Sequence, residues 1–577
     1  MLDFSQEKDY DCMQRGNFIM KTTFKYDHYY KYDEIKSNLE YFTSTYPDLC
    51  SFETICTTLK GRSVFAVTLS HGNPANKPAY YIDGNTHAGE VTGSMAAMHT
   101  IDYLLTNYGT DPKCTTILDR FTVYVIPRIS PDGAEAYLST PYSLRSVDRP
   151  YLTETQDEGV YQEDIDQNGV IAMMRFKAPD GVWVIDETNP VQMKKRTPDM
   201  MDGDFYHIYT EGMIQGDIDP LFPAKPLWGL DFNRNYPFGW FTENRQPGAG
   251  PYPLSNPETK AVVDFVIAHP NICGVATHHT SGGIILYPPG TRPEKSAPRK
   301  DMKFFKEIGA MATEEMGYGC INIFDSFFEE QSEYSSGAFD DWCYQSRGIP
   351  AYTIELWDLE TRAGCKPRWP VDSTPKTMDQ QLEDLGKVYT WVQEHHPEAF
   401  IPWTPFKHPQ LGDIEIGGLD IKFTYQNAPF EYLTQEVEKT TRFTLRMACT
   451  LPRLEIKPEV TNVGDDLYKV DLTIRNLGYL PTYLTDSLLD LQLDHEIKVT
   501  LDSDVELIAG SKVAKIEKLE GYGCIPVSSG FYANLTTQAY QPLKQTLSYV
   551  VKGKAGTEIN FTISAPKTGK QEVSITL

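Results

Sequence analysis

The apolar run FTVYVIPRI at residues 121–129 constrains the fold of this chain more than any other segment. A near-continuous apolar run of this kind is typical of a strand that is buried on both faces of a sheet. Residues 63–70, 79–85, 271–279 and 351–356 are also strand-like, and residues 33–47, 93–105 and 256–269 have helical apolar spacing. This alternation over residues 22–400 predicts an α/β sheet with helices on its faces.

The pattern changes in the C-terminal part of the chain. Residues 433–448 indicate a helix or a connector, and from residue 454 onward short alternating segments such as LYKVDLTIRNLG and EIKVTLDS are separated by turns. Such segments are typical of an antiparallel β-sandwich. We therefore predict an N-terminal extension at residues 1–21, an α/β domain at 22–430 and a β-sandwich domain at 431–577.

Residues 150–228 interrupt the alternation, because they are rich in Asp, Gly, Pro and Met and have poor periodicity. We interpret this segment as a long insertion between elements rather than as a domain. Within it, the first half of a calcium-binding loop is matched by Asp164, Asp166, Asn168 and Gly169. The twelfth loop position is Arg175, where a calcium-binding EF-hand has Glu. An Asx-rich turn is therefore the favoured interpretation, and bound calcium is the alternative.

The charge of the chain limits its partners. With 53 Lys and Arg against 79 Asp and Glu, the formal net charge is −26, which opposes binding to nucleic acid. This charge is compatible with cationic substrates, or with solubility alone. No apolar run approaches the ~18–20 residues that a membrane-spanning helix needs. The acidic N-terminus lacks the apolar core of a secretory signal, which predicts a leaderless, cytoplasmic chain, or a secreted one whose signal was removed.

The segment YIDGNTHAGE at residues 81–90 carries the first sign of chemistry, since His87 and Glu90 are three residues apart where a helix approaches. Residues at this spacing share a helix face, so an imidazole and a carboxylate can converge on one zinc ion. A third ligand is available in THHTSGGIILYPPG (277–290), where two histidines end a strand-like segment. Both segments end strands, and ligands bind beyond the carboxyl ends of strands in open α/β sheets. Taken alone, His87 and Glu90 are also compatible with a helix-capping pair.

Five motifs in order strengthen the zinc hypothesis. They are HAGE (87–90), SPDGAEAY (130–137), GLDFNRNYP (229–237), HHTSGGIILYP (278–288) and SSGAFDDWCYQSRGIPAYTIEL (335–356). Over about residues 22–400 the chain resembles the zinc metallocarboxypeptidases, the family of pancreatic carboxypeptidases A and B and their bacterial relatives. The resemblance implies a mixed, mostly parallel central sheet with helices on both faces, and one zinc ion per chain. It also implies hydrolysis of the C-terminal bond of a peptide or protein partner.

The resemblance also assigns the metal site and the base. It implies that His87, Glu90 and His279 are the zinc ligands, with His278 as a neighbour on the opposite face of its strand. It implies that Glu355, in TIEL, is the catalytic glutamate. Considered by itself, a carboxylate at the end of a buried strand favours a salt-bridged structural residue.

The same resemblance implies residues that bind the substrate. Asn233 and Arg234 resemble the pair that binds the terminal carboxylate, a role that suits the two parallel N–H donors of arginine. Arg145 resembles the arginine that polarises the scissile carbonyl, and Arg149, one helical turn away, is the alternative. Tyr334 is expected to be the tyrosine that closes over the bound C-terminus, after a one-residue shift from the gapless alignment. Asp340 falls at the specificity position, where a carboxylate favours a C-terminal Lys or Arg.

Three alternative functions are compatible with these residues. One is a peptidoglycan stem-peptide carboxypeptidase that releases diaminopimelate, which also carries an amine, and another is a small-substrate amidohydrolase. A third is a non-catalytic binding protein on the same scaffold, with the β-sandwich as an adhesion module. The presence of all three ligands and of Glu355 argues against loss of activity. The insertion at 150–228 is expected to reshape the rim of the cleft, so the family does not give the size of the substrate.

Overall fold

The computed structural model describes residues 20–151, 158–187, 189–218, 221–224, 228–328, 330–370, 376–525 and 542–577. Almost all of the predicted N-terminal extension lies outside these ranges. None of the helices within them combines the length and the apolar character that crossing a bilayer requires.

An eight-stranded mixed sheet forms the centre of the first part of the chain, with the strand order β1-β2-β4-β3-β11-β14-β12-β13. The strands are β1 (Cys50–Thr57), β2 (Ser63–Leu69), β3 (Ala79–Gly84), β4 (Thr122–Ile126), β11 (Ile272–Thr280), β12 (Ile284–Tyr287), β13 (Gly319–Asn322) and β14 (Ala351–Leu356). The pairs β3–β4, β3–β11, β11–β14 and β12–β13 are parallel, and the other three are antiparallel. The prediction of a mixed, mostly parallel sheet is therefore confirmed, and β4, in the apolar run, is buried along its whole length.

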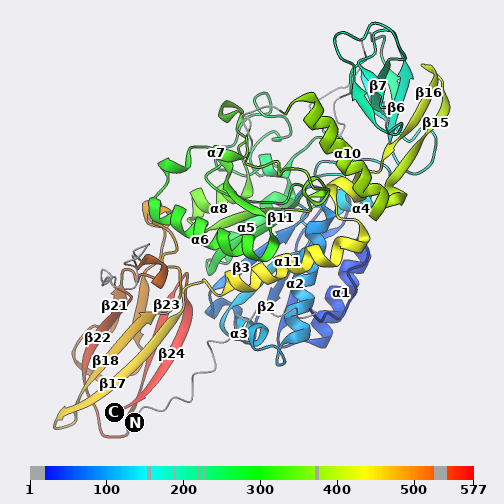
Figure 1. Cartoon of the computed structure of the whole chain (residues 1–577). Coiled ribbons are helices and arrows are strands. Elements are labelled where there is room, and N and C mark those ends of the chain that lie inside the picture. The colour runs from blue at the N-terminus through cyan, green and yellow to red at the C-terminus, as the bar shows by residue number, and fades with distance from the viewer. Residues whose placement is uncertain are drawn as a thin grey trace.

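Helices cover both faces of this sheet. They include α1 (Tyr32–Thr45), α2 (Val91–Asn107), α3 (Pro112–Arg120), α4 (Pro131–Ser139), α5 (Pro257–Ala268), α6 (Arg299–Met316), α8 (Phe339–Arg347) and α11 (Phe430–Ala448). Successive side chains of a strand point to opposite faces. The ring of Tyr81 on β3 contacts Phe265 of α5 and Phe339 of α8, whereas Tyr80 lies on the other side, near Met447 of α11. Figure 1 shows α11 running alongside α2 on that second side.

Close backbone packing seats the turn between β3 and α2. A Cβ atom on Gly84 would lie 2.4 Å from the backbone oxygen of Gly93, and one on Gly93 would lie 2.6 Å from the backbone oxygen of His278. Only glycine allows approaches this close. The N-terminal end of α2 is therefore held against the ends of β3 and β11, the two strands that carry the histidine motifs.

The described residues of the insertion at 150–228 form six short strands. They are β5 (Gly159–Gln162), β6 (Met173–Lys177), β7 (Trp183–Ile185), β8 (Met193–Lys195), β9 (Tyr206–Thr210) and β10 (Gly212–Gln215). Four of them join β15 (Phe400–His408) and β16 (Gly412–Leu419) in a sheet of order β15-β16-β6-β9-β7-β8, which Figure 1 shows to one side of the central sheet. Its small core includes Val160 and Met174 from the insertion and Ile414 and Ile416 from β16. The sequence predicted no elements here, because strands of three to five residues carry little periodicity.

The last part of the chain forms two four-stranded antiparallel sheets, of order β17-β18-β22-β20 and β21-β19-β23-β24. These strands are β17 (Leu454–Gly464), β18 (Leu467–Asn476), β19 (Ile497–Leu501), β20 (Glu506–Ala509), β21 (Val513–Ile516), β22 (Lys544–Lys552), β23 (Glu558–Ala565) and β24 (Gly569–Thr576). Residues such as Val470 and Val499 from the two sheets share one hydrophobic core, so the predicted β-sandwich is confirmed.

The segment before the sandwich is the helix α11, not a connector. Its residues Leu433, Val437 and Phe443 belong to the core of the central sheet, whereas the core of the sandwich begins with Leu454. The domain boundary near residue 430 stays a prediction, and the packing of α11 favours a boundary after this helix.

Candidate metal centre

The turn that follows β3 places His87 and Glu90 beyond the carboxyl end of this strand. Asn85, which has a positive φ of 60°, donates hydrogen bonds from Nδ2 to the backbone oxygens of His87 (2.6 Å) and Ala88 (3.1 Å). Glu90 precedes α2, and its side chain makes no capping hydrogen bond. The geometry therefore argues against the helix-capping alternative and leaves both side chains free to face another partner.

That partner is His279, near the end of β11. Its Nδ1 atom lies 2.7 Å from Oε2 of Glu90 and 3.2 Å from Nδ1 of His87, and Oε1 of Glu90 lies 2.7 Å from the same His87 nitrogen. All three side chains are buried, and one ligand atom from each lies within 4.8 Å of the others. Two nitrogens bound at ~2.0–2.1 Å to a tetrahedral zinc ion are about 3.3 Å apart. The His₂Glu cluster therefore fits a zinc ion.

Asp231 forms a hydrogen bond with the ligand His87 on the side of the ring that faces away from the cluster. The Nε2–H of His87 donates to Oδ1 of Asp231 at 3.0 Å, which leaves Nδ1 of the imidazole free for the metal. Burial alone would raise the pKa of Asp231, but the charges of Arg145 and Arg234 hold it well below its ordinary value. No role for Asp231 was expected from the sequence. The available signal was its position in GLDFNRNYP, two residues before Asn233.

The neighbouring His278 lies on the opposite face of β11. Its Nδ1–H donates to the backbone oxygen of Asp83 at 2.8 Å, and burial lowers its pKa to about 4. The choice of His279 as the ligand therefore agrees with the geometry.

Glu355 lies on β14 next to the metal cluster. In the parallel pairing of β11 with β14, Glu355 is the register partner of His279, so the two side chains point to the same face. Its Oε2 atom has no hydrogen-bond partner among the described residues. Burial, and then the charge of Glu90, raise the pKa of Glu355 well above its ordinary value. The alternative of a salt-bridged structural glutamate does not match this unpartnered oxygen.

The two candidate arginines face different partners. Nε of Arg145 donates to Oδ2 of Asp231 at 2.9 Å, and its NH1 lies 3.6 Å from Oε1 of Glu90. Arg149 instead donates to Oδ1 of Asn256 and lies 3.8 Å from Oε1 of Glu258. Only Arg145 of the pair therefore borders the metal cluster in the described structure.

Asn233 and Arg234 lie in the short helix η3 (Phe232–Arg234), beside the cluster. Nδ2 of Asn233 is 3.3 Å from Nε2 of His279, and its Oδ1 accepts the backbone N–H of Phe339 at 3.2 Å. Burial lowers the pKa of Arg234, and the negative charge of Asp231 opposes this shift. The structure therefore places Asn233 beside the ligand His279, and Arg234 3.9 Å from Asp231, the carboxylate that hydrogen-bonds the ligand His87.

Asp340 is buried in the first turn of α8. Its Oδ2 accepts the hydroxyl of Thr353 at 2.7 Å, and its Oδ1 accepts the backbone N–H of Asp341 at 2.7 Å. Thr353 lies on β14 two residues before Glu355, which places both side chains on one face of the strand. Burial raises the pKa of Asp340.

Tyr334 follows the short helix η5 (Gln331–Glu333). Its ring contacts Phe241 and Phe324, with a centroid distance of 5.7 Å in each case. Among the described residues, none of its ring contacts is with the metal cluster, so the structure does not bring Tyr334 to the zinc ligands.

The predicted Asx turn is present in the insertion. The backbone N–H of Asn168 donates to Oδ1 of Asp164 (3.0 Å) and of Asp166 (3.1 Å). A carboxylate that the sequence did not point to, Glu211, lies with these two aspartates, and one oxygen of each lies within 4.8 Å of the others. Arg175, at the twelfth loop position, pairs instead with Glu415 at 2.8 Å. Calcium binding at this turn stays a prediction.

The proteins that this chain resembles include a family of zinc enzymes, in agreement with a zinc site at this cluster. The family described as zinc carboxypeptidase matches residues 35–369, and a domain of unknown function matches residues 453–576. The chain belongs to the zinc carboxypeptidase family. It is thus a metallocarboxypeptidase, a hydrolase that uses one zinc ion, and the His87–Glu90–His279 cluster fits that ion.

The similarity to individual proteins is moderate. The chain is 24% identical to carboxypeptidase A1 of Mus musculus over 378 residues, which is 63% of this chain and 70% of that protein. It is 23% identical to carboxypeptidase A1 of Rattus norvegicus, with the same two shares. The crystal structure of carboxypeptidase A from Helicoverpa armigera matches with a TM-score of 0.37 and 15% identity, over 65% of this chain and 76% of that one.

Proposed function

We propose that the protein removes single residues from the C-terminus of peptides or proteins and prefers a C-terminal Lys or Arg. A zinc ion held by His87, Glu90 and His279 would supply Lewis-acid activation of water and of the scissile carbonyl. The remaining roles belong to the side chains around it.

Glu355 is the proposed general base and acid. It is the register partner of His279, and its Oε2 atom has no hydrogen-bond partner among the described residues. We assign it the proton of the attacking water, which it later delivers to the leaving amine. Arg145, whose NH1 lies 3.6 Å from Oε1 of Glu90, is assigned the role of stabilising the negative charge that develops on the carbonyl oxygen.

Recognition of the free C-terminus is assigned to Asn233 and Arg234. A guanidinium offers two parallel N–H donors to a carboxylate, and the side-chain amide adds a further donor. Because this clamp binds a terminal carboxylate, it would hold the last peptide bond over the metal and exclude internal bonds. A peptide with an amidated C-terminus should therefore not be cleaved, and equal rates for the free and amidated forms would remove the clamp from the proposal.

The preference for basic residues rests on one observation, the buried carboxylate of Asp340. Its bonds from Thr353 and from the backbone of Asp341 use one hydrogen-bonding position on each oxygen, so further positions remain for an ammonium or guanidinium. A charge-assisted hydrogen bond of this kind is worth about 1.5–3 kcal/mol, or roughly 10-fold to 100-fold in rate.

The test compares kcat/KM for peptides that differ only in a C-terminal Lys or Leu, with zinc-loaded protein. We expect a Lys/Leu ratio of roughly 10 to 100, which Asp340→Asn lowers toward one. Asp264→Asn is the control, because Asp264 is exposed on α5, pairs with Lys260 and has no proposed contact with substrate. A Lys/Leu ratio near one in the wild-type protein would overturn the basic preference.

Two further outcomes separate the alternatives. A stem peptide that ends in diaminopimelate also presents an amine to Asp340, and a kcat/KM well above that of the Lys peptide would favour the peptidoglycan function. If the protein carries one zinc per chain and cleaves neither peptides nor N-acyl amino acids, the exopeptidase proposal fails and a non-catalytic binding protein becomes the better description.

A further inference from the structure

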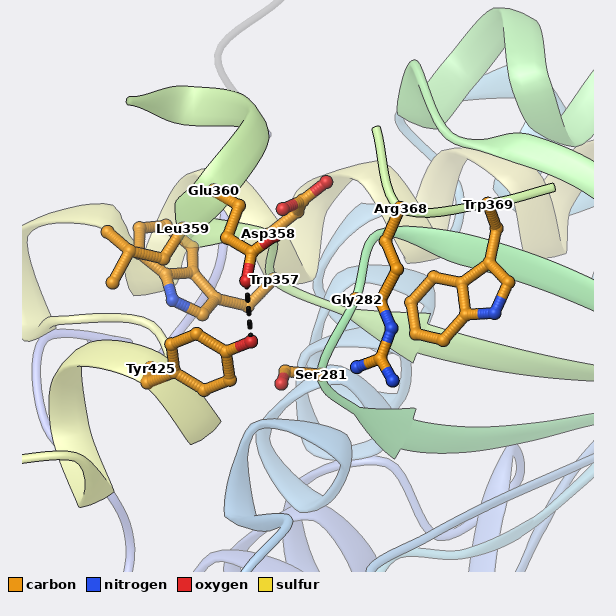
Figure 2. Close-up of a pocket in the computed structure, with 9 residues that line it drawn as sticks. All are labelled: Ser281, Gly282, Trp357, Asp358, Leu359, Glu360, Arg368, Trp369 and Tyr425. Atoms are coloured by element: carbon orange, nitrogen blue, oxygen red, sulfur yellow. Dashed lines mark hydrogen bonds between the residues drawn. The ribbon is translucent and has the colours of Figure 1, made fainter. Parts of the chain in front are cut away.

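A pocket lies beyond the ends of β11 and β14, the strands that carry His279 and Glu355. It opens between Ser281 and Gly282, which follow β11, and Trp357 and Asp358, which follow β14. Figure 2 shows the side chain of Arg368 reaching into this pocket from a separate segment, with the indole of Trp369 beside it.

The pocket is close to the proposed reaction centre. Ser281 is two residues beyond His279, and Trp357 is two residues beyond Glu355. Two residues of extended chain span about 7 Å. A peptide whose scissile bond lies over the metal would therefore reach the pocket within one or two residues.

The pocket also lies on a defined side of that bond. Asp340, which we assign to the C-terminal residue of the substrate, is bonded to Thr353, two residues before Glu355 on β14. The pocket begins two residues after Glu355. The two sites are thus on opposite sides of the base along one strand, so the pocket faces the part of the substrate that precedes the scissile bond.

Arg368 is the cationic group of this pocket. Among the residues that the structure describes, no carboxylate pairs with its guanidinium, which lies 4.7 Å from the centre of the Trp369 ring. This is notable in a chain with a net charge of −26.

The two acids that line the pocket have other partners. Oδ1 of Asp358 accepts the backbone N–H of Thr361 at 2.9 Å, and Oε1 of Glu360 accepts the hydroxyl of Tyr425 at 2.8 Å. Figure 2 shows Glu360 and Tyr425 across the pocket from Arg368. Among the described residues, the guanidinium is therefore available to bind a group that enters the pocket.

We propose that Arg368 forms a subsite for an acidic side chain of the substrate, on the N-terminal side of the scissile bond. A carboxylate is the group that a planar guanidinium binds best in two parallel hydrogen bonds, and the indole of Trp369 supports the guanidinium from one side. This inference rests on the proposed exopeptidase function. It adds that the substrate carries an acidic residue close to its C-terminal basic residue.

The test is a set of peptides with one C-terminal Lys and either Glu or Gln at each of the three positions before it. At the position that reaches the pocket, we expect kcat/KM to be about three- to fivefold higher for Glu than for Gln, the size of an exposed ion pair. Arg368→Gln should bring this ratio to about one, and Arg368→Lys should keep part of it. The ratio is measured on a single protein preparation, so a partly folded variant does not distort it.

Arg299→Gln is the matched control, since it removes an equal charge from the exposed start of α6 and should leave the Glu/Gln ratio unchanged. A ratio of one at all three positions in the wild-type protein overturns the subsite and leaves the proposed function intact. A preference that survives in Arg368→Gln does the same. If no peptide of the set is cleaved, both the proposed function and the subsite are overturned.

Discussion

Replacing Asp231 with Asn tests how far the metal centre depends on the residue behind it. Three groups donate to the Asp231 carboxylate: Nε2 of His87 (3.0 Å), Nε of Arg145 (2.9 Å) and the backbone N–H of Asn233 (2.8 Å). An asparagine has one oxygen and one NH₂ group. In either orientation, His87 or Arg145 would therefore meet a donor where it now meets an acceptor.

We expect Asp231→Asn to lose the zinc affinity that a hydrogen-bond partner of a metal-bound histidine provides. Such changes weaken metal binding by about 10-fold to 100-fold, which corresponds to about 1.4–2.7 kcal/mol. We place Asp231→Asn in the upper half of this range, because the substitution also removes the charge that faces Arg145 and leaves that guanidinium 3.6 Å from the ligand Glu90. The zinc dissociation constant should therefore rise by about 30-fold to 100-fold.

The assay is a competition between the apoprotein and a chromophoric zinc chelator at pH 7.5, with circular dichroism to verify folding. Asp264→Asn is the matched control, because Asp264 is exposed on α5 and pairs with Lys260, so the zinc affinity of this variant should stay within twofold of wild type. A dissociation constant for a folded Asp231→Asn protein within threefold of wild type would refute the supporting role of Asp231.

Three further predictions concern the base, the choice of arginine and the attachment of the sandwich. Glu355→Gln should lower kcat by about 10²–10⁴-fold while metal analysis still finds one zinc per chain, and loss of the zinc would instead make Glu355 part of the metal site. Arg145→Ala should lower kcat/KM by about 100-fold, whereas Arg149→Ala should change it by less than about threefold; similar losses in both would contradict the geometry. Lys567, whose Nζ donates to the backbone oxygen of Ile272 at 2.7 Å, has its pKa lowered by burial from 10.5 to about 8. Between these pH values the unfolded chain binds more protons at Lys567, so stability rises with pH in this window. The free energy of unfolding of wild type relative to Lys567→Met should therefore increase by about 3 kcal/mol between pH 7.5 and 10.5, and a difference that does not vary with pH would contradict this.

The sequence predicts best what a single segment encodes. The apolar run at 121–129 gave a fully buried strand, and the small residues at 93–105 gave a fully buried stretch of helix. The spacing of His87 and Glu90 placed two ligands on one turn before that helix. In each case the signal and its structural consequence lie within about one element, so no long-range information was needed.

Features that depend on distant partners were harder to predict. His87 and Asp231 are 144 residues apart, and no local pattern shows that the second backs the first. The sequence makes Arg145 and Arg149 equal candidates for the same role, because they lie four residues apart in one segment. Their partners distinguish them: Arg145 donates to Asp231, and Arg149 lies near Glu258. The insertion strand β6 pairs with β16, about 240 residues further along the chain. Its own sequence is too short to reveal this pairing.

The choice between His278 and His279 shows why a motif alone does not define the chemistry. The two residues are adjacent on β11, so their side chains point to opposite faces, and only one faces Glu90. The register of β11 against β14 pairs His279 with Glu355, which fixes a ligand and the proposed base on the same face. A slip of one residue would leave the sheet intact and turn His278 toward the carboxylates in place of His279. The site therefore depends on strand register as much as on the identity of its residues. Gly93 lets the start of α2 approach the backbone of His278 closely, so the turn that carries His87 and Glu90 lies beside this part of β11.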